Sequence, residues 1–326
     1  MRFVPGALRL LTGLLILATA PAAVLALGGF AVPELDLLNH LQMLLILGTL
    51  VAAGAAIVLR MRRRWTVLAL IGLVASGWTF GPEFVSSLAP RPAAPGAATL
   101  KVMTHNLFGL NDDMARVDAA IRAEDPDIIA LQEYFPEQAA LDRLLRGRYP
   151  YAVRCQGGKR ANLGLYSKLP FEREMDANAC PERAFGAQRT AHIIAGFRLA
   201  DGAAFSLITT HMDWPFPIER QREQFAATAE AARALEGPLL VVGDFNSTPW
   251  SYALRGFEAE AGLTRQTRSL ITYPLLFTTP RGLVRTVPFL PLDQVFSRGL
   301  TVTELRTGAE TGSDHLPVVF SFAVSP

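Results

Sequence analysis

Apolar residues dominate the first ninety positions of the chain in three long runs. Leu10–Phe30 is broken only by Thr, Gly and Pro, Leu41–Leu59 carries no charge, and Trp65–Phe80 can be extended to Leu88 across Gly, Pro and Glu. A helix of about twenty apolar residues crosses a bilayer. The pattern therefore predicts a membrane anchor over residues 1–88 with about three transmembrane helices, of which the third is the shortest.

Charges beside these runs predict their orientation. The loop after the first run contains Glu34 and Asp36 but no Lys or Arg, whereas the loop after the second is "RMRRRW", Arg60–Trp65. Basic loops stay in the cytoplasm. Three crossings then place everything after about Ser87 outside the cytoplasm. If the third run does not cross, the remainder lies inside instead.

Two further sequence features concern the ends of this anchor. Arg2 and Arg9 precede the first run and small residues follow it, so a cleaved signal peptide is the alternative to a first helix. The Pro- and Ala-rich stretch 89–99 reads as a semi-rigid linker, which leaves a domain over residues 100–326. Nearly all basic residues are arginine, which suggests a bacterial genome rich in G and C and therefore a bacterial inner membrane with the domain on its periplasmic side.

Beyond the linker, short apolar or alternating runs predict strands separated by helical patterns. The predicted strands are Leu100–Asn106, Pro126–Tyr134, Phe205–Trp214, Pro238–Asn246, Pro291–Ser297 and Gly312–Phe322. The predicted helices are Asp113–Glu124, Glu137–Arg146 and Ile218–Leu235.

Polar residues recur where these strands begin or end. They are Asn106, Glu133, His211, Asp244, Asn246, Asp293, Asp314 and His315. Packing alone does not require such residue types, and a buried carboxylate is costly unless it is paired or bound to a metal. The pattern favours a shared polar site at the strand ends.

Charge and cysteine content narrow the function only slightly. The whole chain has a formal net charge of +2, and residues 100–326 contain two more acidic than basic side chains. This balance is unlike the strongly basic footprint of a general nucleic-acid binder. The two cysteines, Cys155 and Cys180, either form a disulfide in an oxidising compartment or are separate thiols.

Six motifs carry a resemblance to a known family. "THNLFG", "LQE", "THMD", "GDFNSTP", "LDQVF" and "SDHLPV" occur in the order found in the endonuclease/exonuclease/phosphatase family, and they cover Leu100–Phe322. The resemblance implies an α/β fold, a four-layer sandwich in which two mixed, mostly antiparallel sheets are flanked by helices. It also implies hydrolysis of a phosphoester by water with a divalent metal, which is Mg²⁺ with Mn²⁺ as the alternative.

The same resemblance implies roles for the strand-end residues. Glu133 matches the principal metal ligand, Asn106 the amide beside the metal, and Asp314 a second carboxylate on the metal side. Mg²⁺ is commonly held by one or two carboxylates together with water and substrate phosphate.

The remaining strand-end residues match the catalytic groups of the family. Asp244 would orient and deprotonate the attacking water, and Asn246 would hydrogen-bond the water or a phosphate oxygen. His315 would donate to the phosphate with Asp293 fixing its tautomer, and His211 would contact the phosphate or the leaving oxygen. The structural alternatives are a satisfied core histidine at His211 and a helix cap or surface acid at Asp293.

Substrate contacts are less specific. Asn162 in "RANLGLYSK", Arg189 before a predicted strand and Arg268 are candidate substrate-binding residues, whereas His105 is expected to be structural. Arginines alternate with aromatic residues in the segment 265–291, which suits stacked bases or an anionic lipid headgroup beside acyl chains. We therefore expect a nuclease-like phosphodiesterase. A phospholipid or sphingomyelin phosphodiesterase and a non-catalytic membrane-anchored binding protein are the alternatives, and no protein partner is predicted.

Overall fold

The computed structural model describes residues 4–92, 99–155, 160, 162–172 and 192–324. These residues form two compact units. One, which we call the helical unit, comprises residues 1–89 together with 248–255. The other, the sheet unit, comprises residues 90–247 and 256–326.

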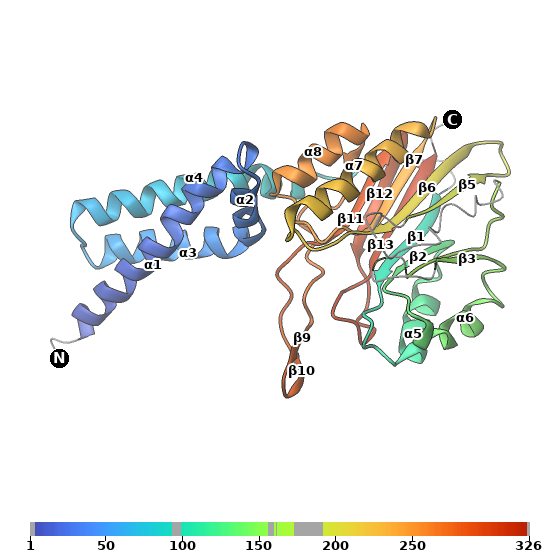
Figure 1. Ribbon diagram of the computed structural model, residues 1–326, viewed down its shortest axis with the longest axis horizontal. Coiled ribbons are helices and arrows are strands. Elements are labelled where there is room, and N and C mark those ends of the chain that lie inside the picture. Colours follow the sequence, from blue (N-terminus) through green and yellow to red (C-terminus); the bar gives the residue numbers. More distant parts are fainter. Residues whose placement is uncertain (1–3, 93–98, 156–159, 161, 173–191, 325–326) are drawn as a thin grey trace. The chain divides into compact units, whose positions relative to one another are not determined.

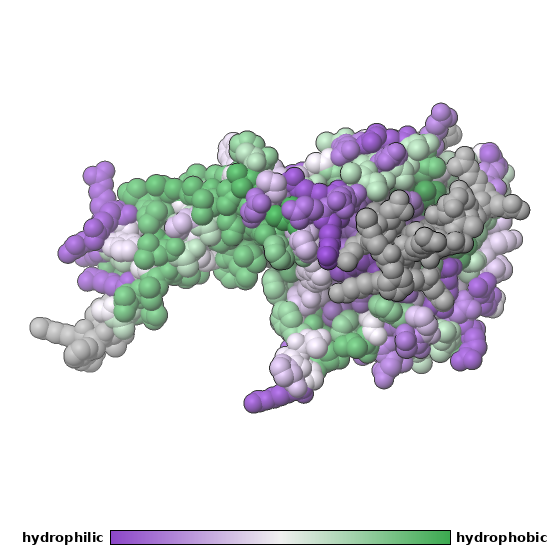
Figure 2. Space-filling model, viewed as in Figure 1, coloured by the Kyte–Doolittle hydropathy of each residue, from purple (hydrophilic) through white to green (hydrophobic). Residues whose placement is uncertain are grey.

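Three helices in the helical unit are long and apolar enough to cross a membrane, over Gly6–Phe30, Pro33–Val58 and Arg63–Ser87. Figure 2 shows the apolar surface that covers them, and residues such as Val74 and Trp78 are largely exposed. The elements are α1 (Val4–Ala26), η1 (Leu27–Phe30), α2 (Pro33–Asp36), η2 (Leu37–Leu41), α3 (Gln42–Val58) and α4 (Arg63–Ser87). The three predicted apolar helices are therefore present.

Close packing and one buried polar network hold the helical unit together. Gly72 of α4 approaches α1 so closely that a Cβ there would lie 2.5 Å from the Cβ of Ala20. The buried carboxylate of Asp36 accepts hydrogen bonds from the Ser251 hydroxyl (2.9 Å) and from the backbone N–H groups of Tyr252 (2.8 Å) and Ala253 (3.0 Å). Residues 248–255 are thus fixed within this unit by a carboxylate placed where a helix N-terminus needs an acceptor.

The sheet unit contains two mixed sheets (Figure 1). The first sheet has the order β12-β13-β1-β2-β4-β3, in which β1 and β2 are parallel and the other pairs are antiparallel. Its strands are β1 (Thr99–Asn106), β2 (Ile128–Gln132), β3 (Tyr151–Cys155), β4 (Leu163–Ser167), β12 (Leu300–Thr307) and β13 (Val318–Val324).

The second sheet has the order β5-β6-β7-β11-β8, with β6 and β7 parallel. Its strands are β5 (His192–Arg198), β6 (Ala204–His211), β7 (Leu239–Asp244), β8 (Thr264–Arg265) and β11 (Asp293–Arg298). A separate two-stranded hairpin, β9 (Leu276–Thr279) with β10 (Gly282–Arg285), projects from the sheet unit (Figure 1).

Buried apolar residues define four layers. One core cluster joins the facing surfaces of the two sheets, with Val102 and Ile128 from the first and Leu207 and Val242 from the second. The outer face of the first sheet packs on α5 (Met114–Glu124) and α6 (Ala140–Leu145). Phenylalanines of the second sheet and of α7 (Ile218–Ala234) and α8 (Tyr252–Ala261) pack together on the opposite side. The predicted four-layer α/β sandwich is confirmed.

Cys155, at the end of β3, is buried and disulfide-bonded. The other cysteine of the chain, Cys180, lies outside the described residues.

Candidate active site

Strand register places three of the polar strand ends in one row. In the second sheet His211 pairs with Asp244, and Asp244 pairs with Asp293 on its other side. In the first sheet Asn106 ends β1 beside Gln132, the residue before Glu133. Asn106 Nδ2 donates to Asp244 Oδ2 at 2.9 Å, so the polar ends of the two sheets meet.

The backbone at this row adopts conformations that most residues avoid. Gly243 has φ 144°, and a Cβ there would lie 2.0 Å from the carbonyl oxygen of Thr210, so only glycine fits. Glu133 and Asn246 have φ values of 50° and 46°. Left-handed conformations cost free energy for residues other than glycine and concentrate at functional sites. The conformations of Glu133 and Asn246 support the assignment of this region as a site.

Asp244 is the most heavily hydrogen-bonded carboxylate of the row. Besides Asn106, its oxygens accept from the backbone N–H of Asn246 (2.8 Å) and from Asn246 Nδ2 (3.2 Å). Burial opposes ionisation of Asp244, but the positive charge of His315 and the nearby His211 imidazole outweigh it and lower its pKa. Asp244 is therefore a buried carboxylate that stays ionised at neutral pH.

His315 and Asp293 form a buried pair. His315 Nδ1 lies 2.7 Å from Asp293 Oδ2, and His315 Nε2 lies 3.7 Å from Asp244 Oδ2. Burial opposes protonation of His315, but Asp293 and Asp244 outweigh it and raise its pKa to about 10. Burial raises the pKa of Asp293, whereas the imidazolium of His315 favours its ionised form. His315 is thus an imidazolium with Nε2–H directed at Asp244 and Nδ1–H bound by Asp293.

Glu133 and Asp314 add negative charge to the same place. The backbone N–H of Gly109 donates to Glu133 Oε2 at 2.9 Å. Burial raises the pKa of Asp314 to about 7, together with the charges of Glu133 and Asp244 and against the effect of His315. Among the described residues, the buried Asp314 Oδ1 has no hydrogen-bond partner. A carboxyl group whose pKa is raised by neighbouring carboxylates and which keeps an oxygen without a hydrogen-bond partner fits a site for a cation.

A second group of donors is also compatible with a metal. Asp244, Asp293 and His315 are all buried and offer ligand atoms within 4.8 Å of one another, so this group could bind an ion. However, the His315–Asp293 hydrogen bond already uses one donor of each of these two residues. Asn106 likewise uses its amide to donate to Asp244, and its Oδ1 accepts from the backbone N–H of Phe108 at 2.9 Å.

Arg160 is a site residue that the sequence pattern did not reveal. Its side chain is buried, its Nε donates to Asp213 Oδ1 at 2.9 Å, and one of its terminal nitrogens lies 2.6 Å from His211 Nε2 and 3.9 Å from Glu133 Oε1. An arginine N–H can only donate, so His211 Nε2 is the acceptor in this contact. The only sequence signal for Arg160 was its position two residues before Asn162.

Two aromatic side chains also border the site. The Tyr273 ring lies 4.6 Å from the His315 ring, and Trp214, which is 42% exposed, contacts Tyr273 edge-on at 5.7 Å. Burial raises the pKa of Tyr273 to about 12, together with the charges of Asp314, Asp244 and Glu133. Tyr273 therefore stays a neutral phenol beside the carboxylates.

The other candidate residues fall in different places. Asn162 is buried, and its carbonyl accepts from the N–H of Tyr134, the residue after Glu133. Arg268 is half-buried, with its charge near that of Arg91, and Arg189 lies outside the described residues. His105 is buried with Nε2 2.7 Å from the Thr311 hydroxyl, and burial and His315 lower its pKa to about 3, as a structural histidine requires.

Comparison with known sequences identifies the family. Residues 103–315 match the model of the Endonuclease/Exonuclease/phosphatase family, and the chain belongs to this family. Its members are generally hydrolases of phosphoester bonds and commonly use divalent metals.

Similar curated proteins include a "UPF0294 protein" of Vibrio cholerae, 30% identical over 131 residues, which are 40% of this chain and 44% of that protein. A "UPF0294 protein" of Vibrio parahaemolyticus is 29% identical over 132 residues, 40% of this chain and 43% of that protein. Each match thus spans less than half of the relative.

Solved structures with the same fold share little sequence with this chain. An endonuclease/exonuclease/phosphatase from Bacteroides vulgatus aligns with a TM-score of 0.58 and 18% identity, covering 70% of this chain and 100% of that one. TDP2 from D. rerio, solved with a single-strand DNA product, aligns with a TM-score of 0.54 and 15% identity, covering 69% and 99%. The human Nocturnin catalytic domain, solved with a bound sulfate, gives 0.51 and 18%, covering 70% and 95%. Identities this low establish the fold alone.

Proposed function

We propose that this protein is a divalent-metal-dependent phosphodiesterase that catalyses attack of water on phosphorus. The observation that carries the proposal is the environment of Asp244. It is a buried carboxylate held by two asparagine amides and kept ionised beside the imidazolium of His315. A fixed base with a fixed proton donor nearby meets the two needs of phosphoester hydrolysis that side chains can supply.

The reaction follows from these positions. Asp244 accepts a hydrogen bond from the attacking water and takes its proton as the bond to phosphorus forms and the bond from phosphorus to the leaving oxygen breaks. The leaving oxygen departs as an oxyanion and is protonated by solvent water. His315 donates from Nε2 to a non-bridging phosphate oxygen and offsets the charge that develops there, while Asp293 holds Nδ1. Asn246 binds the water or the phosphate. Arg160, held by Asp213, adds a fixed positive charge next to His211 and Glu133.

The donor set fits a divalent cation such as Mg²⁺ or Mn²⁺ held by Glu133 and Asp314, with Asn106 beside it. A bound cation would supply Lewis-acid stabilisation of the phosphoryl oxygens. We place it there because Asp314 Oδ1 has no hydrogen-bond partner among the described residues and the pKa of Asp314 is raised. Asp293 Oδ1 also lacks a partner, but the other oxygen of Asp293 is held by His315 Nδ1, which commits this carboxylate to the imidazole.

A nuclease-like substrate is the first candidate. The Trp214–Tyr273 pair beside His315 presents an aromatic surface on which a nucleobase can stack. One relative in fold, D. rerio TDP2, was solved with a single-strand DNA product. The small net charge of residues 100–326 limits this proposal to short or single-stranded segments rather than to a long duplex.

A phospholipid phosphodiesterase is the second candidate, and the β9–β10 hairpin favours it. Phe277 and Val284 are cross-strand partners that are 44% and 51% exposed, and Leu283 and Val287 are also exposed. Apolar side chains on an isolated hairpin suit contact with acyl chains better than contact with water. The same site chemistry would then act on a lipid phosphodiester.

Full-length protein in detergent micelles tests the activity. It should cleave bis-p-nitrophenyl phosphate with Mg²⁺ or Mn²⁺, and EDTA should abolish cleavage. Asp244→Asn should lower kcat by about a hundredfold or more, since removing a general base costs that much. The control is Glu223→Gln, an exposed change on α7. No turnover with any divalent ion would refute the proposal and favour a non-catalytic binding protein.

Plasmid or single-stranded DNA and labelled phospholipid vesicles then separate the two substrate classes. A nuclease cleaves DNA and leaves the vesicles intact, and a Trp214→Ala variant loses more activity on DNA than on bis-p-nitrophenyl phosphate. Preferential lipid cleavage, weakened by Phe277→Ser, would replace the first candidate by the second.

A further inference from the structure

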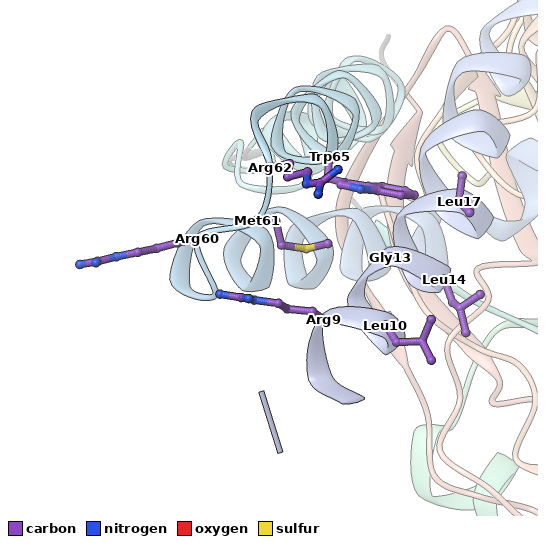
Figure 3. Close-up of a pocket in the computed structure, with 9 residues that line it drawn as sticks. All are labelled: Arg9, Leu10, Gly13, Leu14, Leu17, Arg60, Met61, Arg62 and Trp65. Atoms are coloured by element: carbon purple, nitrogen blue, oxygen red, sulfur yellow. The ribbon is translucent and has the colours of Figure 1, made fainter. Parts of the chain in front are cut away.

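A pocket of about 370 Å³ lies at one end of the helical unit (Figure 3). It is bounded by the start of α1, the connection between α3 and α4, and the first turn of α4. Its walls combine basic and apolar side chains: Arg9, Leu10, Leu14, Leu17, Arg60, Met61, Arg62 and Trp65, with Gly13 at the base of the α1 side. All of the residues that line this pocket belong to the helical unit, whereas the residues of the candidate active site belong to the sheet unit.

The positive charge at this end of the helices has few acidic residues near it in the sequence. Arg9, Arg60 and Arg62 line the pocket, and the sequence contains no Asp or Glu at positions 1–33 or 37–82. The Arg9 guanidinium is fixed by two hydrogen bonds to the carbonyl oxygen of Leu59, at 3.2 and 3.0 Å. Arg9, Arg60 and Arg62 are exposed, so their charges are accessible to an anion from outside the chain.

Helix α4 adds a second attraction for an anion. It is a helix of 25 residues whose first turn contains no acidic residue, and within the described residues no side chain caps its N-terminus at Arg62. The N-terminal end of a helix carries partial positive charge and free N–H groups. The α4 N-terminus and the pocket arginines thus favour the same kind of ligand.

The apolar wall specifies what else the ligand carries. Three leucines recur on one face of α1 at helical spacing, and all three are more than half exposed: Leu10, Leu14 and Leu17. Figure 3 shows Leu14 and Leu17 along α1, with Arg9 and Arg60 extending past the end of α3. An anionic group attached to hydrocarbon matches both walls, and basic pockets at the ends of membrane helices bind such headgroups.

We propose that this pocket binds an anionic phospholipid of the surrounding membrane. The headgroup phosphate lies among Arg9, Arg60 and Arg62, and the acyl chains lie along Leu14, Leu17 and the Trp65 ring. The site is independent of the proposed catalytic function. It makes the anchor selective for acidic lipid at the end of the helices that the basic loop marks as cytoplasmic.

Trp65 provides a local probe of the proposal. Full-length protein is placed in nanodiscs of phosphatidylcholine with added brominated phosphatidylglycerol or brominated phosphatidylcholine of the same acyl chains. Bromine quenches tryptophan on contact, and the difference between the wild type and Trp65→Phe isolates Trp65 from the other tryptophans. We expect quenching of Trp65 at lower concentrations of the glycerol lipid than of the choline lipid.

Single charge removals test the arginines. Arg60→Gln and Arg62→Gln should each weaken the preference for phosphatidylglycerol by about tenfold, because hydrogen bonds between charged groups are the strong ones. Arg63→Gln removes the same charge one residue further along, does not line the pocket, and should change the preference by less than about twofold. Inorganic phosphate should not compete, since it lacks acyl chains.

Three results would each overturn the proposal. Equal quenching by the two lipids would mean that no anionic headgroup is selected. An equal loss in Arg63→Gln would show diffuse charge attraction instead of a site. Displacement of the lipid by inorganic phosphate would show a phosphate site that does not use the apolar wall.

Discussion

Replacement of Asp293 by Asn tests the electrostatic core of the site. Asp293 Oδ2 lies 2.7 Å from His315 Nδ1, and both side chains are buried. Removing one partner of a buried ion pair costs about 3–5 kcal/mol. The pKa of His315 is raised from 6.5 to about 10 by Asp293, Asp244 and Asp314 against the effect of burial, and a net shift of that size corresponds to roughly 5 kcal/mol in favour of the imidazolium.

The expected consequence is a lower pKa of His315 in Asp293→Asn. Because His315 acts as an imidazolium, the alkaline limb of the kcat/KM profile should move to lower pH by at least about one unit. Activity at its optimum should fall by about 10²–10⁴-fold, as expected when the residue that orients a catalytic histidine loses its charge. The assay is cleavage of bis-p-nitrophenyl phosphate as a function of pH, with the exposed Asp201→Asn as the matched control.

Stability provides an independent readout of the same pair. A histidine whose pKa is raised by folding stabilises the folded state fully below its unfolded pKa of about 6.5. That stabilisation is lost as the pH rises through its folded pKa of about 10. Thermal melting in EDTA should therefore show the wild type losing stability between these values and Asp293→Asn losing much less. An unchanged alkaline limb together with an unchanged melting profile would refute the reasoning.

Three further substitutions have definite expected outcomes. Arg160→Gln should lower kcat by about tenfold or more, since a charge-assisted contact to His211 is lost. Arg160→Lys, which keeps the charge, should retain part of the activity, and unchanged kcat in Arg160→Gln would refute this role. Gly243→Ala should prevent recovery of folded protein in detergent, because its Cβ would lie 2.0 Å from a backbone oxygen. Gly256→Ala, whose Cβ would have nothing within 4 Å, should fold normally. Asp36→Ala should lower the melting temperature of the full chain through a loss of about 1–2 kcal/mol of capping, and an unchanged melting temperature would show that its hydrogen bonds to residues 251–253 contribute nothing.

The sequence by itself determined the elements and the inventory of the site. Short alternating or apolar runs identified the strands that end at Asn106, His211 and Asp244, and long apolar runs identified the three helices, because both patterns depend on neighbours in the chain. The motifs around these strand ends then indicated the family, which the match over residues 103–315 confirmed.

Only the tertiary structure decided which residues come into contact and which protonation state their side chains adopt. The row from His211 through Asp244 to Asp293 depends on the register of three strands that are far apart in sequence. The position of Arg160 beside His211 depends on a connection without periodicity, and the raised pKa of His315 depends on two carboxylates from other strands. Such contacts are set by burial and packing over long range, which a local pattern does not encode.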